Sequence, residues 1–121
     1  MNSDSFERSP DWGGALALVS EFEGELTGFL LGREVADEAE VFTLAVMPRY
    51  RRCGHGGALV SAAFETMRSR GVKSIYLEVR ESNLGAIAFY EKFGFSKIGR
   101  RKGYYRSPEE AAITMGKKLG D

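Results

Sequence analysis

The chain has 121 residues, 43% of them hydrophobic and 28% charged, which is typical of one folded domain with a single core. Its 17 basic and 17 acidic residues cancel, so neither nucleic acid nor an anionic membrane is expected as the main partner. One cysteine and one histidine cannot build an internal disulfide or a metal cluster. No apolar run approaches the roughly 20 residues that span a bilayer, and the start lacks the basic and apolar segments of a signal peptide. We therefore expect a soluble, cytoplasmic protein without a bound metal.

The N-terminal third predicts a hairpin after a poorly ordered start. Residues 1–14 are polar and turn-forming, so we expect a disordered or poorly ordered segment there and one domain over residues 15–121. Two apolar stretches that favour β-structure run from Ala15 to Phe22 and from Glu25 to Arg33. Glu23-Gly24 between them indicates a tight turn.

The middle of the chain predicts a strand, a helix and a second strand. Glu40 to Val46 is the first strand, and an Arg- and Gly-rich loop follows from Arg49 to Gly57. Apolar residues then recur at helical spacing from Ala58 to Arg70. Lys73 to Arg80 alternates between apolar and polar residues. Because a helix connects the two strands, they should be parallel.

The C-terminal part predicts a short helix and a final pair of strands. Ser82 or Asn83 can cap a helix that runs through Lys92, and Gly94 marks its end. The order β-β-β-α-β-α-β-β predicts an α/β fold with a mixed sheet. The last two strands are expected at Phe95 to Tyr105 and Ala111 to Leu119.

The loop before the first helix has the features of a phosphate site. It reads R-R-C-G-H-G-G-A-L from Arg51, and helix N-termini bind phosphates through unpaired N–H groups and the helix dipole. Glycines let the backbone approach closely, and Arg51 and Arg52 add charge-assisted contacts. Neither G-x-G-x-x-G nor G-x-x-x-x-G-K-[ST] occurs. An ordinary tight turn is the structural alternative.

The R-x-x-G-x-G motif after L-A-V-M-P resembles the pyrophosphate signature of the GNAT superfamily of N-acetyltransferases. L-E-V-R-E-S-N-L-G-A-I-A-F-Y-E-K-F-G-F matches the same family downstream. D-E-A-E-V-F-T-L-A-V and R-R-K-G-Y-Y-R-S-P-E-E-A-A-I-T-M are similar to RimI-type ribosomal-protein alanine N-acetyltransferases. The resemblance implies a mostly antiparallel sheet with helices packed on it and splayed central parallel strands that bind acetyl-CoA. It also implies acetyl transfer to a protein N-terminal α-amine.

The resemblance implies which residues bind acetyl-CoA. The backbone of the third strand would pair with the pantetheine arm, and loop N–H groups would hold the pyrophosphate. The side chains of Cys53 and His55 are expected only to fill the loop. The implied cofactor-binding residues are Leu44, Ala45, Val46, Arg51, Arg52, Cys53, Gly54, His55, Gly56, Gly57, Ala58, Asn83 and Tyr90.

Glu78 is the candidate general base, by the resemblance and by its place in a strand. A carboxylate in a strand that should be buried is costly unless it is paired or functional. As a base it could take a proton from the attacking amine directly or through water. A structural salt bridge with Arg80, Lys73 or another cation is the alternative.

Three tyrosines complete the candidate site. By the resemblance, Tyr90 is the general acid that protonates the CoA thiolate, although it could simply pack in the core. Tyr104 and Tyr105 are candidate contacts for the acceptor or, alternatively, ordinary strand aromatics. The acceptor could also be a small amine, and a CoA-binding module without turnover is a third possibility.

The chain departs from the family pattern at its start. The family's first strand and two helices are expected to be missing, because about fourteen weakly patterned residues stand in their place. The strand from Ala15 to Phe22 would then be an open sheet edge, which proteins tend to cover. Our hypothesis is therefore a homodimer formed through that edge.

Overall fold

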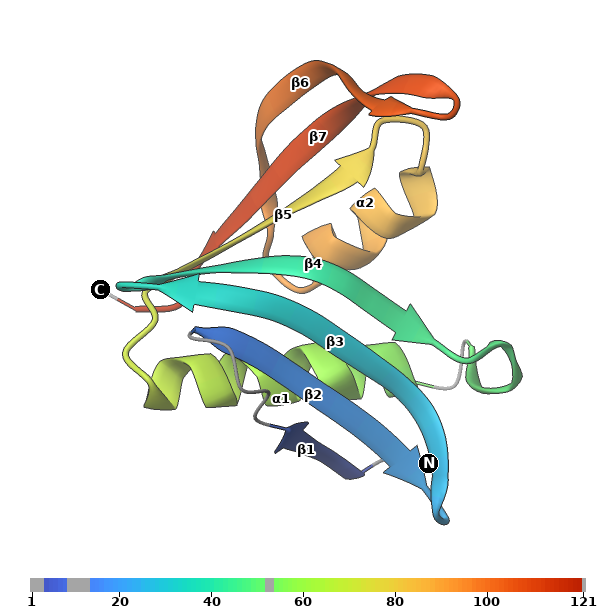
Figure 1. The fold of residues 1–121 in the computed structure, drawn as a ribbon, viewed down its shortest axis with the longest axis vertical. Helices are drawn as coiled ribbons and strands as arrows, with labels where there is room; N and C mark the ends of the chain where they lie inside the picture. Colours follow the sequence, from blue (N-terminus) through green and yellow to red (C-terminus); the bar gives the residue numbers. More distant parts are fainter. Residues whose placement is uncertain (1–3, 9–13, 52–53, 121) are drawn as a thin grey trace.

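The structure is a computed structural model, and it describes residues 4–8, 14–51 and 54–120. These residues form a seven-stranded sheet in the order β1-β2-β3-β4-β5-β7-β6, with two α-helices against it (Figure 1). All neighbouring strands are antiparallel except β4 and β5, which are parallel as predicted. The elements are β1 (Asp4–Arg8), β2 (Ala15–Phe22), β3 (Glu25–Val35), β4 (Glu38–Val46), the 3-10 turn η1 (Pro48–Tyr50), α1 (His55–Ser69), β5 (Ser74–Arg80), α2 (Leu84–Lys92), β6 (Ser96–Arg106) and β7 (Glu109–Lys118).

The predicted β2–β3 hairpin is confirmed. Glu23 and Gly24 at its turn have φ values of 53° and 81°, and positive φ at both positions suits the twist of a tight hairpin. Helix α1 begins three residues before the predicted start at Ala58. Its first turn contains Gly56 and Gly57, which the sequence analysis assigned to the loop.

Strand β1 is the main departure from the sequence prediction. Asp4–Arg8 pairs antiparallel with β2, in register from Asp4 opposite Glu21 to Arg8 opposite Ala17. The prediction of a poorly ordered start is therefore wrong for residues 4–8, and a first strand is not missing. The polar sequence concealed it because backbone pairing at a sheet edge does not require an apolar pattern.

β1 also removes the basis of the expected dimer interface. The predicted open edge at Ala15–Phe22 is hydrogen-bonded to β1 on one side and to β3 on the other. No helix precedes β2 in the described part of the chain. Nor does any helix there have the length and apolar character to cross a bilayer.

Both α-helices pack on one face of the sheet. Leu59, Ala63 and Met67 of α1 and Ile87 of α2 are buried in a cluster with strand residues such as Leu30. Burying each large aliphatic side chain contributes about 1.5–3 kcal/mol. The opposite face, called here the outer face, remains uncovered by these helices.

The β4–β5 pair separates partway along its length. Pairing runs only from Glu38 opposite Ser74 to Val41 opposite Leu77. At the same level the β3–β4 register skips Phe42, and such a bulge bends the strand that carries it. β4 and β5 then diverge (Figure 1), so the predicted splay of the central parallel strands is confirmed.

Candidate active site

A cavity of about 400 Å³ lies on the helix side of the gap between β4 and β5. We call it the inner cavity. The end of β4, the start of α1 and one face of α2 meet there. It is lined by Val46, Arg51, Gly54, Gly56, Gly57, Phe89, Lys92 and Phe93.

Three glycines shape the inner cavity for different reasons. Gly54 is the N-cap of α1 with φ 84°, a left-handed conformation that costs most residues about 1–2 kcal/mol. A Cβ on Gly56 would lie 3.3 Å from the Phe89 ring, and one on Gly57 would lie 3.0 Å from the Phe93 ring. These two glycines therefore let α1 approach α2 closely.

The inner cavity suits an anionic group. The Ala58 N–H donates to the Gly54 carbonyl at 3.0 Å, so it serves the helix, whereas the Gly56 and Gly57 N–H groups lie in the first turn, where anions bind. Nε of Arg51 donates to the Val46 carbonyl at 3.2 Å, which holds the guanidinium beside the cavity. Arg52 and Cys53 lie outside the described residues.

Sequence reasoning missed one wall of this cavity. Phe89, Lys92 and Phe93 line it from α2, and only their spacing of three and four residues, which places them on one helix face, could have signalled this. Lys92 adds a cation beside the α1 N-terminus.

The loop before α1 is braced by the tip of the β2–β3 hairpin. The Tyr50 hydroxyl donates to the Glu25 carboxylate, and Arg49 pairs with the same group at 3.2 Å. The His55 ring is 1% exposed and lies 5.1 Å from Tyr50 and 6.0 Å from Phe22, centroid to centroid. The expectation that the His55 side chain merely fills a loop is therefore wrong, because it is part of an aromatic cluster.

β4 continues past its last pair with β5 through Leu44, Ala45 and Val46. Their backbone remains paired to β3 on one side, while the other side faces the gap. These are the residues for which a strand-like contact with the cofactor was predicted.

Tyr90 and Asn83 come from α2. The half-buried Tyr90 ring packs against Phe89 and Phe95, with centroids 5.3 Å and 5.5 Å away. Burial raises the pKa of its phenol above the ordinary value, so the group is a protonated donor at neutral pH. Oδ1 of Asn83 accepts from the Ala86 N–H at 3.1 Å, which makes Asn83, of the two predicted candidates, the helix cap.

Glu78 points to the outer face of β5. The alternation of the strand places Ile75, Leu77 and Val79 in the core and Glu78 opposite them. Its carboxylate, with 15% of the side chain exposed, accepts from the Thr114 hydroxyl at 3.2 Å and lies 3.5 Å from Arg101 Nε.

The salt-bridge alternative for Glu78 involves neither of the two cations named for it but another one. Arg80 pairs with Glu110 at 3.3 Å, so the cation beside Glu78 is Arg101. The Arg101 side chain is 62% exposed, and exposed pairs contribute about 0–1 kcal/mol. This contact is therefore a weak structural reason for a carboxylate at this position.

A second cavity of about 230 Å³, called here the outer cavity, lies on the outer face at the level where β4 and β5 separate. It is lined by Glu40, Val41, Phe42, Glu78, Tyr104 and Tyr105. The structure thus brings Glu78 together with both predicted acceptor tyrosines. Burial, followed by the nearby Tyr104 and Glu78, raises the pKa of the Tyr105 phenol. Tyr90 lies across the sheet, on the helix side.

The comparisons with known proteins agree with this geometry. Residues 2–95 match the model of the acetyltransferase (GNAT) family. The chain belongs to this family. GNAT acetyltransferases use acetyl-CoA, and the splayed strands with a glycine-rich helix start beside them are the features through which the sequence resembled them.

Relatives of this GNAT protein include enzymes that modify a ribosomal protein. It is 39% identical over 94 residues to the [ribosomal protein bS18]-alanine N-acetyltransferase of Haemophilus influenzae, covering 75% of this chain and 64% of that protein. The chain therefore spans somewhat under two thirds of this relative's length.

Solved structures show the same fold. The ribosomal-protein-S18-alanine N-acetyltransferase of Escherichia coli superposes with a TM-score of 0.84 at 36% identity, covering 89% of this chain and 71% of that one. A GNAT family acetyltransferase from Elizabethkingia anophelis with acetyl-CoA bound has a TM-score of 0.86 at 13% identity and covers 97% and 98% of the two chains. The second match concerns the fold alone, and it shows that the fold occurs at this chain length.

Proposed function

We propose that this protein is an acetyl-CoA-dependent N-acetyltransferase that acts on a protein N-terminal α-amine, of the ribosomal-protein alanine type. The observation that carries this is the outer cavity, where Glu78, Tyr104 and Tyr105 meet beside the gap between β4 and β5. The names of the bS18-alanine relatives support the choice of acceptor.

The described residues fit acetyl-CoA, which supplies the acetyl group as an activated thioester. The Gly56 and Gly57 N–H groups, with Arg51 and Lys92, would hold the pyrophosphate in the inner cavity. The gap-facing backbone of Leu44 to Val46 would pair with the pantetheine arm. Because Gly54, Gly56 and Gly57 have no side chains, nothing on these residues would obstruct the approach of the pyrophosphate to the backbone.

Glu78 and Tyr90 have complementary proton roles across the sheet. Glu78 accepts the proton that the attacking amine loses, directly or through a water molecule. Tyr90, whose phenol is kept protonated by burial, donates a proton to the departing sulfur. Glu78 gains one proton and Tyr90 loses one, while the amine nitrogen bonds directly to the acetyl carbon as the carbon–sulfur bond breaks, so no side chain of the enzyme is acetylated.

The acceptor choice also follows from proton energetics. At pH 7 a protein α-amine, with a pKa of about 7.7–8.0, is deprotonated at a cost of roughly 1 kcal/mol. A lysine, with a pKa of about 10.4, costs roughly 4.6 kcal/mol. A single carboxylate base suits the α-amine.

CoA release from acetyl-CoA and an Ala-starting peptide tests this proposal. We expect turnover with the free peptide and none with the same peptide already acetylated at its N-terminus, even when it contains lysine. Turnover only with small amines would shift the acceptor class. Tight binding of acetyl-CoA without turnover on any acceptor would indicate a silent binding module.

A further inference from the structure

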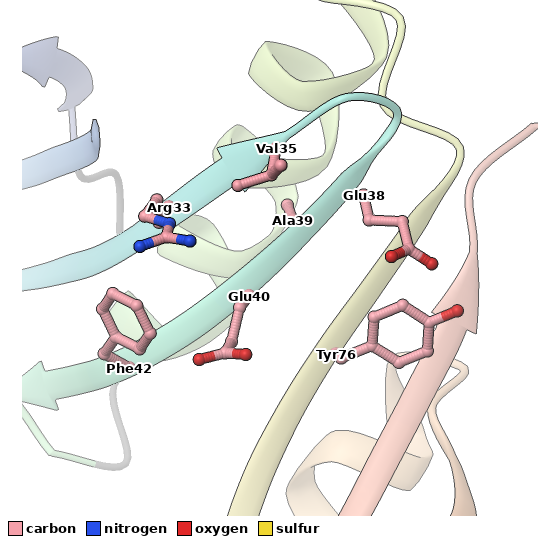
Figure 2. Close-up of a pocket in the computed structure, with 7 residues that line it drawn as sticks. All are labelled: Arg33, Val35, Glu38, Ala39, Glu40, Phe42 and Tyr76. Carbon is pink, nitrogen blue, oxygen red and sulfur yellow. The ribbon is translucent and has the colours of Figure 1, made fainter. Parts of the chain in front are cut away.

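A third cavity, of about 210 Å³, continues the outer cavity along the outer face of the sheet. We call it the side groove. It is lined by Arg33, Val35, Glu38, Ala39, Glu40, Phe42 and Tyr76 (Figure 2). Glu40 and Phe42 line both cavities, so the side groove and the outer cavity form one track that begins at Glu78.

Resting on the proposed function, we infer that the side groove binds the second and third residues of the acceptor peptide and prefers a lysine or arginine there. A peptide whose N-terminal amine lies at Glu78 enters the groove if it extends along β5 from Glu78 toward Tyr76. Strands advance about 3.3 Å per residue, so the third residue of an extended peptide lies roughly 6.6 Å from its amine. That is the displacement from Glu78 to Tyr76, and Tyr76 is level with Glu40.

The chemistry of the groove favours a cation with an apolar stem. Figure 2 shows Glu38 on the Tyr76 side, Glu40 between Phe42 and Tyr76, and Arg33 on the β3 side. Two carboxylates thus outnumber one guanidinium. Neither carboxylate forms an ion pair within the described part of the chain.

Aromatic surface supports the same occupant. Phe42 is 53% exposed, and the Tyr76 ring lies over Gly116 of β7, where an added Cβ would come within 3.1 Å of the ring. A lysine or arginine stem can lie along such rings while its charged end reaches a carboxylate. An acidic side chain in the groove would meet Glu38 and Glu40 unfavourably.

The test uses peptides that start with alanine and differ only at residues two and three, which are both alanine, both lysine or both glutamate. We expect kcat/KM for the lysine peptide to exceed that for the glutamate peptide by about ten-fold at low salt, mostly through KM, and the ratio to shrink as salt rises. Glu38→Gln and Glu40→Gln should each reduce the ratio about two- to five-fold.

Two further variants make the result decisive. Glu65→Gln removes the same charge from an exposed position on α1, on the other face of the sheet, and should leave the ratio unchanged. Glu40→Lys should invert the preference, which a folding defect cannot do. A lysine-to-glutamate ratio of kcat/KM near one overturns the inference, and so does a ratio that none of the groove variants changes. In either case, turnover of the alanine peptide still upholds the proposed function. Absence of turnover with all three peptides overturns both.

Discussion

At Glu78, a catalytic role and a structural role predict different results. We expect Glu78→Gln to lower kcat/KM about 10²- to 10⁴-fold, as loss of a general base does, with little change in acetyl-CoA affinity. Arg101→Ala, which removes the exposed cation beside it, should change the unfolding free energy by no more than about 1 kcal/mol. Steady-state kinetics measure the change in kcat/KM, and urea unfolding measures the change in the unfolding free energy. Undiminished turnover of Glu78→Gln between pH 6 and 9 would exclude Glu78 as the base.

Tyr90 makes a prediction about pH. Because burial raises its pKa, the protonated phenol persists to higher pH than in an ordinary tyrosine, for which the value is about 10. The kcat of the wild type should therefore show no loss from Tyr90 ionisation until the pH exceeds that value. Tyr90→Phe should lower kcat about ten-fold or more at neutral pH and abolish this alkaline limb. A pH profile of kcat identical in the two proteins would contradict the role.

At the scale of elements, the turn that starts α1 can be compared with the one that ends it. Gly54 has φ 84° and Gly71 has φ 81°, and a Cβ on either would meet nothing within 4 Å. Gly54→Ala and Gly71→Ala should therefore destabilise the fold similarly, by about 1–2 kcal/mol each. Gly54 lines the inner cavity and Gly71 does not, so we expect Gly54→Ala but not Gly71→Ala to weaken acetyl-CoA binding in calorimetry. Equal affinity losses would mean that the effect is general destabilisation.

Elements with strong local signals were predictable from the sequence, and those set by long-range geometry were not. β2 was predicted at its observed bounds, and Gly94 does adopt the left-handed φ expected after α2. β1 was missed because its polar residues carry no periodic signal. The bulge at Phe42, which opens the gap, depends on the register with β3 and leaves no mark on β4 alone.

The candidate site was predictable to a similar degree. The glycine-rich motif pointed to the inner cavity, and the downstream L-E-V-R-E-S-N stretch pointed to Glu78, whose catalytic role stays a prediction. The burial of His55 beside Phe22 and Tyr50 could not be foreseen, since it depends on where the hairpin tip falls. The same holds for the α2 wall of the cavity and for Arg101 as the cation beside Glu78.

At the scale of the whole molecule, β1 covers the eight-residue edge of β2 and leaves a shorter, five-residue strand at this edge of the sheet. A chain that begins after Arg8 would expose the β2 edge, whose Leu16 and Leu18 lie in the core. We expect it to self-associate with rising concentration, because unpaired edges template strand addition. Light scattering of the shortened and full chains tests this. A shortened chain that stays monomeric, with unchanged amide exchange in β2, would show that β1 is dispensable.

The short pairing of β4 with β5 has a mechanical consequence. β5, β7 and β6 form one half of the sheet, and four paired positions between β4 and β5 join this half to the other strands. By comparison, β5 and β7 share seven paired positions. The β4–β5 pair has the fewest paired positions of any neighbouring strands in the described sheet, so we expect the two halves to change their mutual angle there. A ligand that contacts both β4 and β5 would restrict this change of angle. We therefore expect the sheet to be more rigid with such a ligand bound than without it.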